Sequence, residues 1–336
     1  MSQEEPLVIT GEYPTIDRKR TNLFSLDFAL SLKGQLGLPS RSMVEIYGRP
    51  NAGKSTLAYY LLAALSEAGD RVVIGDIEML DRDYIKTSMG FSGMEGEVNI
   101  INTTEISKKQ SKPRSHEDIM MEVADKLAVP STPAAMFDSI GAIATLSEVE
   151  GDIGEAFWGK RAKAVGQFSR KVLGVLRNKE TPSNALVINH FHQAMGGRGH
   201  LTPGGQMLEH AVAIRLWLWT KEVFTDEKSG SILGFLVEGS VTKLRYGGKG
   251  RNFQFYIVPG LGVHVGASAM FDCFSLGLAD RKSTVKIGDK SLGHLKAGLL
   301  RYALEGKQLK FAPFLKLLAD YEDEIRKGEH LGLQED

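Results

Sequence analysis

The residues with the clearest chemical potential lie in a short glycine-rich segment near position 50. Residues 48–55 read GRPNAGKS, which satisfies the pattern GxxxxGK[ST] at every fixed position. Glycines let the backbone wrap closely around phosphate groups, so that amide hydrogens and the start of the next helix point at them. In this pattern the lysine reaches the β- and γ-phosphates, and the hydroxyl that follows binds Mg²⁺. The sequence therefore predicts a site for ATP and Mg²⁺ that includes Gly48, Asn51, Ala52, Gly53, Lys54, Ser55 and Thr56.

Three carboxylates follow apolar runs and are candidates to complete this site. Asp138 ends the run AAMFD and can hold Mg²⁺ together with Ser55, although an aspartate at this position can equally cap a helix. Glu78 ends the run RVVIGDIE and can orient or deprotonate the water that attacks the γ-phosphate. Asp76, two residues earlier, competes with Glu78 for that role. Both alternatives remain open from the residues alone.

Strands and helices alternate through the region that must position these residues. Buried-type strands are expected at 43–47, 71–78, 134–140, 185–189 and 213–219, with helices at 57–68, 119–127 and 162–177. This alternation implies βαβ units and an α/β fold with a mostly parallel central sheet flanked by helices. Ligands of such sheets bind at the carboxyl ends of the strands, where the carboxylates named above are expected to lie.

The chain divides into three expected parts. Residues 1–40 form an N-terminal segment, in which 7–10 reads as a short strand and 24–32 as a short helix. Residues 41–271 form the core. Residues 272–336 form a small C-terminal domain, where the strand signal gives way to helices at 291–304 and 311–326.

Composition limits the classes of protein that remain. The 336 residues carry 41 basic and 41 acidic side chains, so a nucleic-acid partner would need a local basic surface rather than a global excess. Cys273 is the only cysteine, which excludes an intrachain disulfide and a cysteine-based zinc cluster. The acidic N-terminus does not suit a signal peptide, and no apolar run is long enough to span a membrane. We therefore expect a cytoplasmic protein without membrane contact.

The segment from Asp138 to Leu216 resembles RecA-family recombinases in the order and spacing of its motifs. These are DSIGAIATLSEVEGDIGEAFWGKRAKAVGQFSRKVLGVL, VINHFHQAMGG and TPGGQMLEHAVAIRL. VEIYGRPNAGKSTL and DIEMLDRDY extend the resemblance upstream and SVTKLRYGGKG extends it downstream, over about residues 20–275 in all. UvsX-like phage recombinases share parts of the pattern. The resemblance implies a RecA-type P-loop NTPase core that forms helical filaments on single-stranded DNA.

The resemblance also assigns roles around the nucleotide. Glu78 matches the catalytic glutamate of the family, and His190 stands where a glutamine senses the γ-phosphate. Lys243 and Arg245 match two basic residues that reach the γ-phosphate of a neighbouring protomer, where cations stabilise transition-state charge. The adenine-contacting pair of the family corresponds to Asp81 and Tyr84, although the spacing from Glu78 is one residue shorter here.

Two glycine-rich segments, 150–159 and 190–205, match the DNA-binding loops of the family. Trp158 and Met195 align with apolar residues that insert between base triplets. The second segment is shorter than in RecA, and its middle, GGRGHL, has no close counterpart. The resemblance implies DNA contacts from Trp158, Lys163, Arg170, His192, Met195, Arg198, Gly204 and Gly205. The basic residues can also be the solvated face of a helix, and Trp158 can be a packing residue; the residues alone leave both readings open.

Three functions agree with these motifs. The resemblance favours an ATP-dependent recombinase that pairs single-stranded DNA with homologous duplex DNA, hydrolyses ATP at protomer interfaces and works with single-strand-binding and loader proteins. A recombination mediator or accessory ATPase would be expected to lack Glu78, the two basic residues or one loop. A ring-shaped helicase would be expected to carry an additional N-terminal domain and to place its arginine finger in another context.

Overall fold

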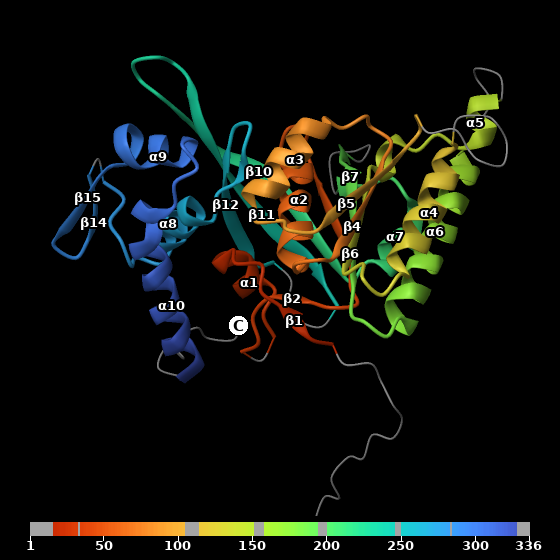
Figure 1. The fold of residues 1–336 in the computed structure, drawn as a ribbon, viewed down its shortest axis with the longest axis horizontal. Helices are drawn as coiled ribbons and strands as arrows, with labels where there is room; N and C mark the ends of the chain where they lie inside the picture. Colours follow the sequence, from red (N-terminus) through yellow and green to blue (C-terminus); the bar gives the residue numbers. More distant parts are fainter. Residues whose placement is uncertain are drawn as a thin grey trace, which may run out of the picture.

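A computed structural model of the chain describes residues 16–32, 34–104, 114–150, 158–193, 200–245, 250–282 and 284–327. Within these ranges a sheet of nine strands forms the centre of the molecule (Figure 1). Its order is β13 (Gly262–Val263), β12 (Asn252–Val258), β11 (Ile232–Leu244), β10 (Ile214–Thr225), β3 (Met43–Gly48), β7 (Asn184–His190), β6 (Ala134–Asp138), β4 (Arg71–Asp76) and β5 (Glu97–Asn102).

Neighbouring strands from β10 through β5 run parallel to one another, and the pairs β10–β11, β11–β12 and β12–β13 are antiparallel. The predicted α/β fold with a mostly parallel central sheet is therefore confirmed. The carboxyl ends of β3, β4, β6 and β7 meet at one edge, as ligand binding in such sheets requires.

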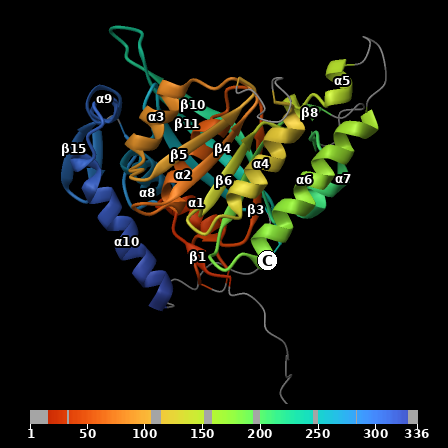
Figure 2. The same cartoon turned by 45° about the vertical axis from the view of Figure 1, so that its right-hand side comes forward.

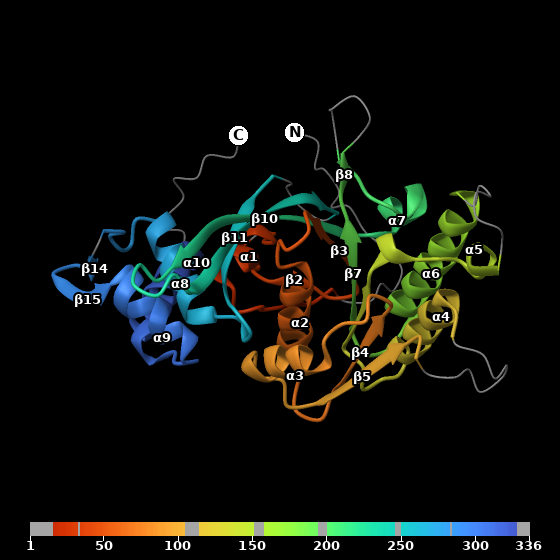
Figure 3. The ribbon, with the colours of Figure 1, turned by 90° about the horizontal axis from the view of Figure 1, so that it is seen from above.

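Helices cover both faces of the parallel part of the sheet (Figures 2 and 3). One face packs against α2 (Lys54–Leu65) and α3 (Arg82–Phe91), and the other against α4 (His116–Leu127) and α6 (Trp158–Asn178). Along β3, Val44 and Ile46 belong to the first hydrophobic cluster and Met43 to the second. Because alternate side chains of a strand point to opposite faces, a continuous apolar strand supplies both clusters.

Shorter elements connect these layers. They are β1 (Arg18–Lys19), α1 (Phe24–Ala29), β2 (Leu38–Pro39), the 3₁₀ turn at Ile140–Ala142, α5 (Leu146–Glu150), β8 (His192–Gln193), β9 (His200–Leu201) and α7 (Gly205–Ala211). Of the described helices, none is both long enough and apolar enough to cross a lipid bilayer.

The C-terminal region packs in a third hydrophobic cluster that it shares with α1 and with strands β10, β11 and β12. It contains α8 (Val265–Ser275), β14 (Thr284–Ile287), β15 (Lys290–His294), a π-helical turn at Leu295–Leu299, α9 (Leu300–Leu304), a 3₁₀ turn at Leu309–Phe311 and α10 (Ala312–Lys327). Phe271, Phe311 and Phe314 are buried together there with Tyr256 of β12. The boundary expected between residues 271 and 272 falls within α8.

Most predicted elements of the core are confirmed to within a few residues, but one helix was expected to start too early and one long strand was not predicted. Residues 291–294 were expected to begin a helix and instead belong to β15, because they pair antiparallel with β14. The strand expected at 213–219 is present as β10 and continues to Thr225, and its antiparallel partner β11 was not predicted. The expected strand at 7–10 lies outside the described residues.

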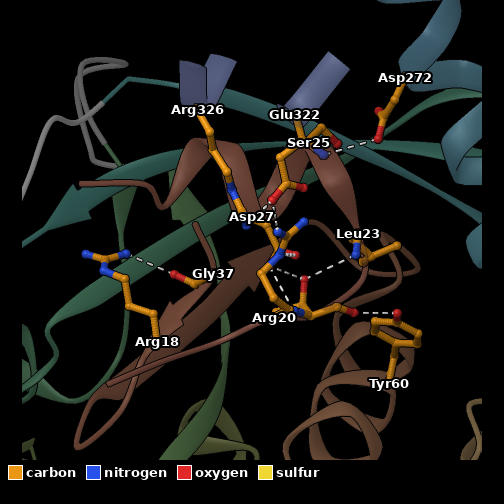
Figure 4. A network of polar contacts seen from close by, with 11 residues as sticks. Arg18, Arg20, Leu23, Ser25, Asp27, Gly37, Tyr60, Asp272, Glu322 and Arg326 are labelled. Atoms are coloured by element: carbon orange, nitrogen blue, oxygen red, sulfur yellow. Dashed lines mark hydrogen bonds and ion pairs between the residues drawn. The ribbon is translucent and has the colours of Figure 1, made fainter. Parts of the chain in front are cut away.

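The N-terminal segment joins α2 to α10 through a buried carboxylate (Figure 4). Asp27 is fully buried and accepts hydrogen bonds from Arg20 Nε at 2.8 Å and from the Thr21 backbone amide at 2.9 Å. Arg20 also contacts Glu322 of α10 at 2.5 Å, and Tyr60 of α2 donates to the Thr21 carbonyl at 2.5 Å. Removing a partner from a buried ion pair is costly, so this cluster holds three distant segments together.

A second buried carboxylate, Asp272, has no cationic partner among the described residues, and its burial predicts a dependence of stability on pH. It accepts hydrogen bonds from the Ser25 backbone amide at 3.1 Å and from Gln254 Nε2 at 3.2 Å. Burial raises the pKa of Asp272 from 3.8 to about 7. Between these values the folded state keeps a proton that the unfolded state has released, so the free energy of unfolding falls as pH rises from about 4 to 7.

The variant Asp272→Asn should remove this part of the pH dependence. The free energy of unfolding of the variant minus that of the unsubstituted protein should increase as pH rises from 4 to 7, by roughly 4 kcal/mol at most. Urea unfolding at several pH values measures the difference, with the exposed Asp289→Asn as the control. Parallel curves for Asp272→Asn and the unsubstituted protein would contradict the account.

Candidate nucleotide site and nucleic-acid interface

The glycine-rich turn between β3 and α2 depends on two of its glycines. Gly53 has φ +78°, in the left-handed region, and a Cβ there would lie 2.6 Å from Ile257 Cδ1. A Cβ on Gly48 would lie 2.4 Å from the Leu218 carbonyl oxygen. A side chain at either position would displace the turn, and α2 starts directly after it at Lys54. The turn therefore aims backbone amides and a helix N-terminus at the same point.

Lys54 and Ser55 stand at this helix start with their polar atoms close to the turn. Lys54 Nζ donates to the carbonyl of Arg49 at 2.8 Å and to that of Gly48 at 3.3 Å, and burial lowers its pKa. Ser55 Oγ donates to Asp138 Oδ2 at 2.7 Å. Burial raises the pKa of Asp138 to about 6. A hydroxyl and a carboxylate facing each other are the oxygen ligands that Mg²⁺ prefers, so this pair fits the ion.

The geometry also bears on the two interpretations of Asp138. The short helix after β6 has Ser139 as its N-cap residue, without a side-chain cap hydrogen bond. Asp138 instead directs its carboxylate to Ser55 across the strand ends. This arrangement supports the magnesium-binding interpretation rather than helix capping.

Glu78 lies where the ends of β4, β6 and β7 converge. Its Oε1 accepts a hydrogen bond from the Ser139 hydroxyl and lies 2.8 Å from His190 Nε2, and Ser139 Oγ lies 3.1 Å from the same ring nitrogen. Asp76 instead accepts the backbone amides of Glu78 at 3.1 Å and Leu80 at 3.0 Å. Asp76 thus shapes the turn that presents Glu78, which favours Glu78 for the chemical role.

The predicted adenine-contacting pair lies beside this site with its polar atoms engaged. The Asp81 carboxylate caps α3 by accepting the amides of Asp83 at 2.9 Å and Tyr84 at 3.1 Å. The Tyr84 hydroxyl lies 2.9 Å from Thr56 Oγ1, at the start of α2. The structure therefore brings Tyr84 against the phosphate-binding helix, while Asp81 fixes the helix that carries Tyr84.

Lys243 and Arg245, at the end of β11, lie at the C-terminal end of α7. Lys243 Nζ donates to the Glu209 carbonyl at 2.5 Å. Arg245 Nη2 donates to the carbonyls of His210 at 2.8 Å and Ala211 at 3.2 Å. In the described part of the chain these hydrogen bonds run to α7 and not to the Lys54–Glu78 group. Both cations contact neutral acceptors, which leaves their charge available to an anion.

The residues expected at DNA are spread over α6, β8 and the start of α7. Lys163 and Arg170 are exposed on α6, whose opposite face is buried. Gly204 and Gly205 have φ +115° and +70° and lead into α7. Trp158 is the first residue of α6 and His192 lies in β8. Met195 and Arg198 lie outside the described residues.

Two residues at or next to this site were not predicted from the sequence. Ser139, next to Asp138, touches both Glu78 and His190. Glu45 is buried in β3 and is bonded to β7 and β10. A signal for Glu45 was present, because it is the one charged residue in the apolar run MVEIY.

A phosphate-binding turn and a facing hydroxyl–carboxylate pair, at the carboxyl ends of a mostly parallel sheet, define a P-loop nucleotide-binding protein. Residues 10–263 match the family model described as RecA N-terminal domain, and the chain belongs to this family.

Curated relatives called Protein RecA match the chain at low identity. The protein of Tropheryma whipplei (strain Twist) is 28% identical over 301 residues, which cover 88% of this chain and 64% of that protein. Those of Wolinella succinogenes and Salinispora arenicola are each 27% identical, covering 90% and 98% of this chain and 83% and 86% of theirs. The chain thus spans slightly less than two thirds of the Tropheryma protein.

Proposed function

We propose that this chain is an ATP-dependent recombinase that forms helical filaments on single-stranded DNA and exchanges strands with homologous duplex DNA. The observation that carries the proposal is the convergence of Lys54, Ser55, Asp138 and Glu78 at one sheet edge of a RecA-family chain. Single-strand-binding and loader proteins are further partners in this proposal.

The nucleotide chemistry follows from the residues at that edge. Lys54 exchanges its carbonyl partners for the β- and γ-phosphates, which are stronger acceptors because they are charged. Ser55 and Asp138 hold Mg²⁺, which when bound neutralises charge on the phosphates. Glu78 accepts a proton from the attacking water, while Ser139 and His190 orient its carboxylate.

Hydrolysis in this proposal is completed by a neighbouring protomer. Lys243 and Arg245 reach the γ-phosphate bound by the adjacent chain and stabilise charge in the transition state. Their hydrogen bonds to the neutral carbonyls of α7 are compatible with this role, because within the described residues these bonds involve no carboxylate that would have to be displaced. Because the neighbouring protomer supplies these cations, a monomer should hydrolyse ATP poorly.

The proposed function keeps the three expected parts of the chain. The N-terminal segment 1–40 contributes a protomer contact, residues 41–271 form the core, and residues 272–336 form the small C-terminal domain.

DNA contacts are proposed for the surface that starts at α6. The exposed Lys163 and Arg170 supply positive charge, and glycine amides next to α7 suit a phosphate backbone without reading bases. Stacking by an aromatic residue on bases is tolerant of sequence. The proposed set is Trp158, Lys163, Arg170, His192, Met195, Arg198, Gly204 and Gly205.

A strand-exchange assay tests the function. The protein is mixed with ATP, Mg²⁺, circular single-stranded DNA and a labelled homologous linear duplex. We expect transfer of the labelled strand that requires both ATP and homology. ATP-dependent binding without any transfer would indicate an accessory ATPase, and strand separation without homology would indicate a helicase; either result contradicts the proposal.

A further inference from the structure

A buried carboxylate joins the strand before the phosphate-binding turn to both neighbouring strands. Glu45 is 1% exposed and lies in β3, between β7 and β10 (Figure 3). Its Oε1 accepts a hydrogen bond from Asn189 Nδ2 of β7 at 2.7 Å. Its Oε2 accepts one from Arg215 Nε of β10 at 2.5 Å, and Arg215 is its direct cross-strand neighbour. One carboxylate oxygen therefore binds the donor on β7, and the other binds the donor on β10.

Both donors continue to the residues that precede α7. Asn189 Nδ2 also donates to the Pro203 carbonyl at 2.7 Å. Arg215 Nη2 donates to Thr202 Oγ1 at 2.9 Å, and its guanidinium stacks 4.8 Å from the centre of the Tyr47 ring. The Glu45 carboxylate thus connects Asn189, near the end of β7, to Thr202 and Pro203, which precede α7.

The C-terminal end of β7 also contacts Glu78, the proposed catalytic glutamate. His190, the next residue after Asn189, places Nε2 2.8 Å from Glu78 Oε1. The His190 ring also packs on Gly141, where a Cβ would lie 2.4 Å from its Cδ2. The His190 backbone amide donates to Asn189 Oδ1 at 2.9 Å, so the Asn189 side chain is tied to the backbone that carries the His190 ring. A shift of His190 is therefore transmitted through Asn189 to Pro203.

We propose that Glu45 and Arg215 are a positioning pair that couples the nucleotide site to the start of α7. Glu45 holds both Asn189 and Arg215 on one rigid strand. A displacement at Glu78 and His190 therefore moves Thr202 and Pro203 and is not taken up by local backbone flexibility. The inference rests on the proposed function. It adds two residues that touch neither nucleotide nor DNA in that function.

The test uses the double variant Glu45→Gln/Arg215→Met. The single variant Glu45→Gln removes the buried carboxylate of Arg215 and leaves it only the exposed Glu209 at 3.4 Å, which destabilises the fold, whereas the double variant removes both charges of the pair. The matched control is Glu238→Gln/Lys221→Met, which neutralises a pair at 3.3 Å between β10 and β11 in the same sheet. Thermal unfolding establishes that each variant is folded.

Two measurements read the coupling on the folded full-length chain. The first is the affinity for a single-stranded oligonucleotide with and without an ATP analogue. The unsubstituted protein and the control should show a large ratio of the two affinities, and the Glu45/Arg215 variant a ratio at least about tenfold smaller. The second is hydrogen exchange of the backbone amides of residues 202 and 204–211 with the ATP analogue and no DNA, where only the Glu45/Arg215 variant should lose the nucleotide response.

The outcomes separate the inference from the proposed function. An affinity ratio and an exchange response equal to those of the control would overturn the positioning role. If the unsubstituted protein shows no nucleotide-dependent DNA affinity, the proposed function fails. In that case the hydrogen-exchange measurement still tests the positioning role. A nucleotide response of the amides that is lost only in the Glu45/Arg215 variant supports the role. A response that the substitutions leave unchanged, or that the unsubstituted protein does not show, overturns it.

Discussion

Replacing Lys54 by alanine should abolish ATP-dependent DNA binding and lower ATP hydrolysis by about 100-fold or more. The ammonium of Lys54 is held over the phosphate-binding turn by the carbonyls of Gly48 and Arg49. It is the cation of the described site that faces the position of the phosphates, and alanine supplies neither its charge nor its hydrogen bonds. Nucleotide affinity, hydrolysis and oligonucleotide binding are measured on the same preparation.

The control for this variant is Lys316→Ala, an exposed lysine of α10 far along the chain from the turn. It should retain hydrolysis and DNA binding. The Lys54 side chain is largely buried, so thermal unfolding must show that Lys54→Ala is folded. Normal strand exchange by a folded Lys54→Ala protein would rule out the proposed mechanism.

Replacing Glu78 by glutamine should separate ATP binding from hydrolysis. Glutamine keeps the size of the side chain and its contact with Ser139, but it cannot accept a proton from water. Loss of a general base slows turnover by about 10²–10⁴-fold. ATP should remain bound, so filaments on single-stranded DNA should persist for longer than those of the unsubstituted protein. Single-turnover hydrolysis and the lifetime of the DNA complex are the two measurements.

Asp76→Asn distinguishes the two carboxylates that the sequence left in competition. The Asp76 carboxylate accepts hydrogen bonds from backbone amides of the turn that carries Glu78. Its loss should therefore act mainly on the free energy of unfolding and less on the rate of ATP hydrolysis. If Asp76→Asn eliminates hydrolysis in a folded protein while Glu78→Gln turns over rapidly, the catalytic role belongs to Asp76.

Much of the nucleotide site could be predicted because its residues follow from spacing and from strand ends. The turn at 48–55 is a local pattern, and Glu78, Asp138 and His190 each lie at or just after the end of an apolar strand. Parallel strands bring these ends to one edge, so residues far apart in sequence meet there. The contacts of Glu78 with His190 and of Ser55 with Asp138 agree with that reasoning.

The missed features depend on contacts between distant segments. Arg20 and Glu322 form an ion pair across 302 positions, which no local pattern reports. In β11, Gly234 and Gly239 make room for aromatic rings of β12, which lies next to β11 only in the folded sheet. A Cβ at Gly234 would lie 2.2 Å from the Tyr256 hydroxyl oxygen. Residues 290–294 form a strand only because β14 pairs with them, and their own sequence did not indicate it.

Electron microscopy with an ATP analogue and single-stranded DNA tests the central claim most directly. We expect helical filaments that require the nucleotide, because in the proposed function Lys243 and Arg245 of one protomer reach the phosphates bound by the next. Glu78→Gln should form the same filaments, and Lys54→Ala should form none. Closed rings, or isolated particles under conditions where nucleotide and DNA are both bound, would contradict the account.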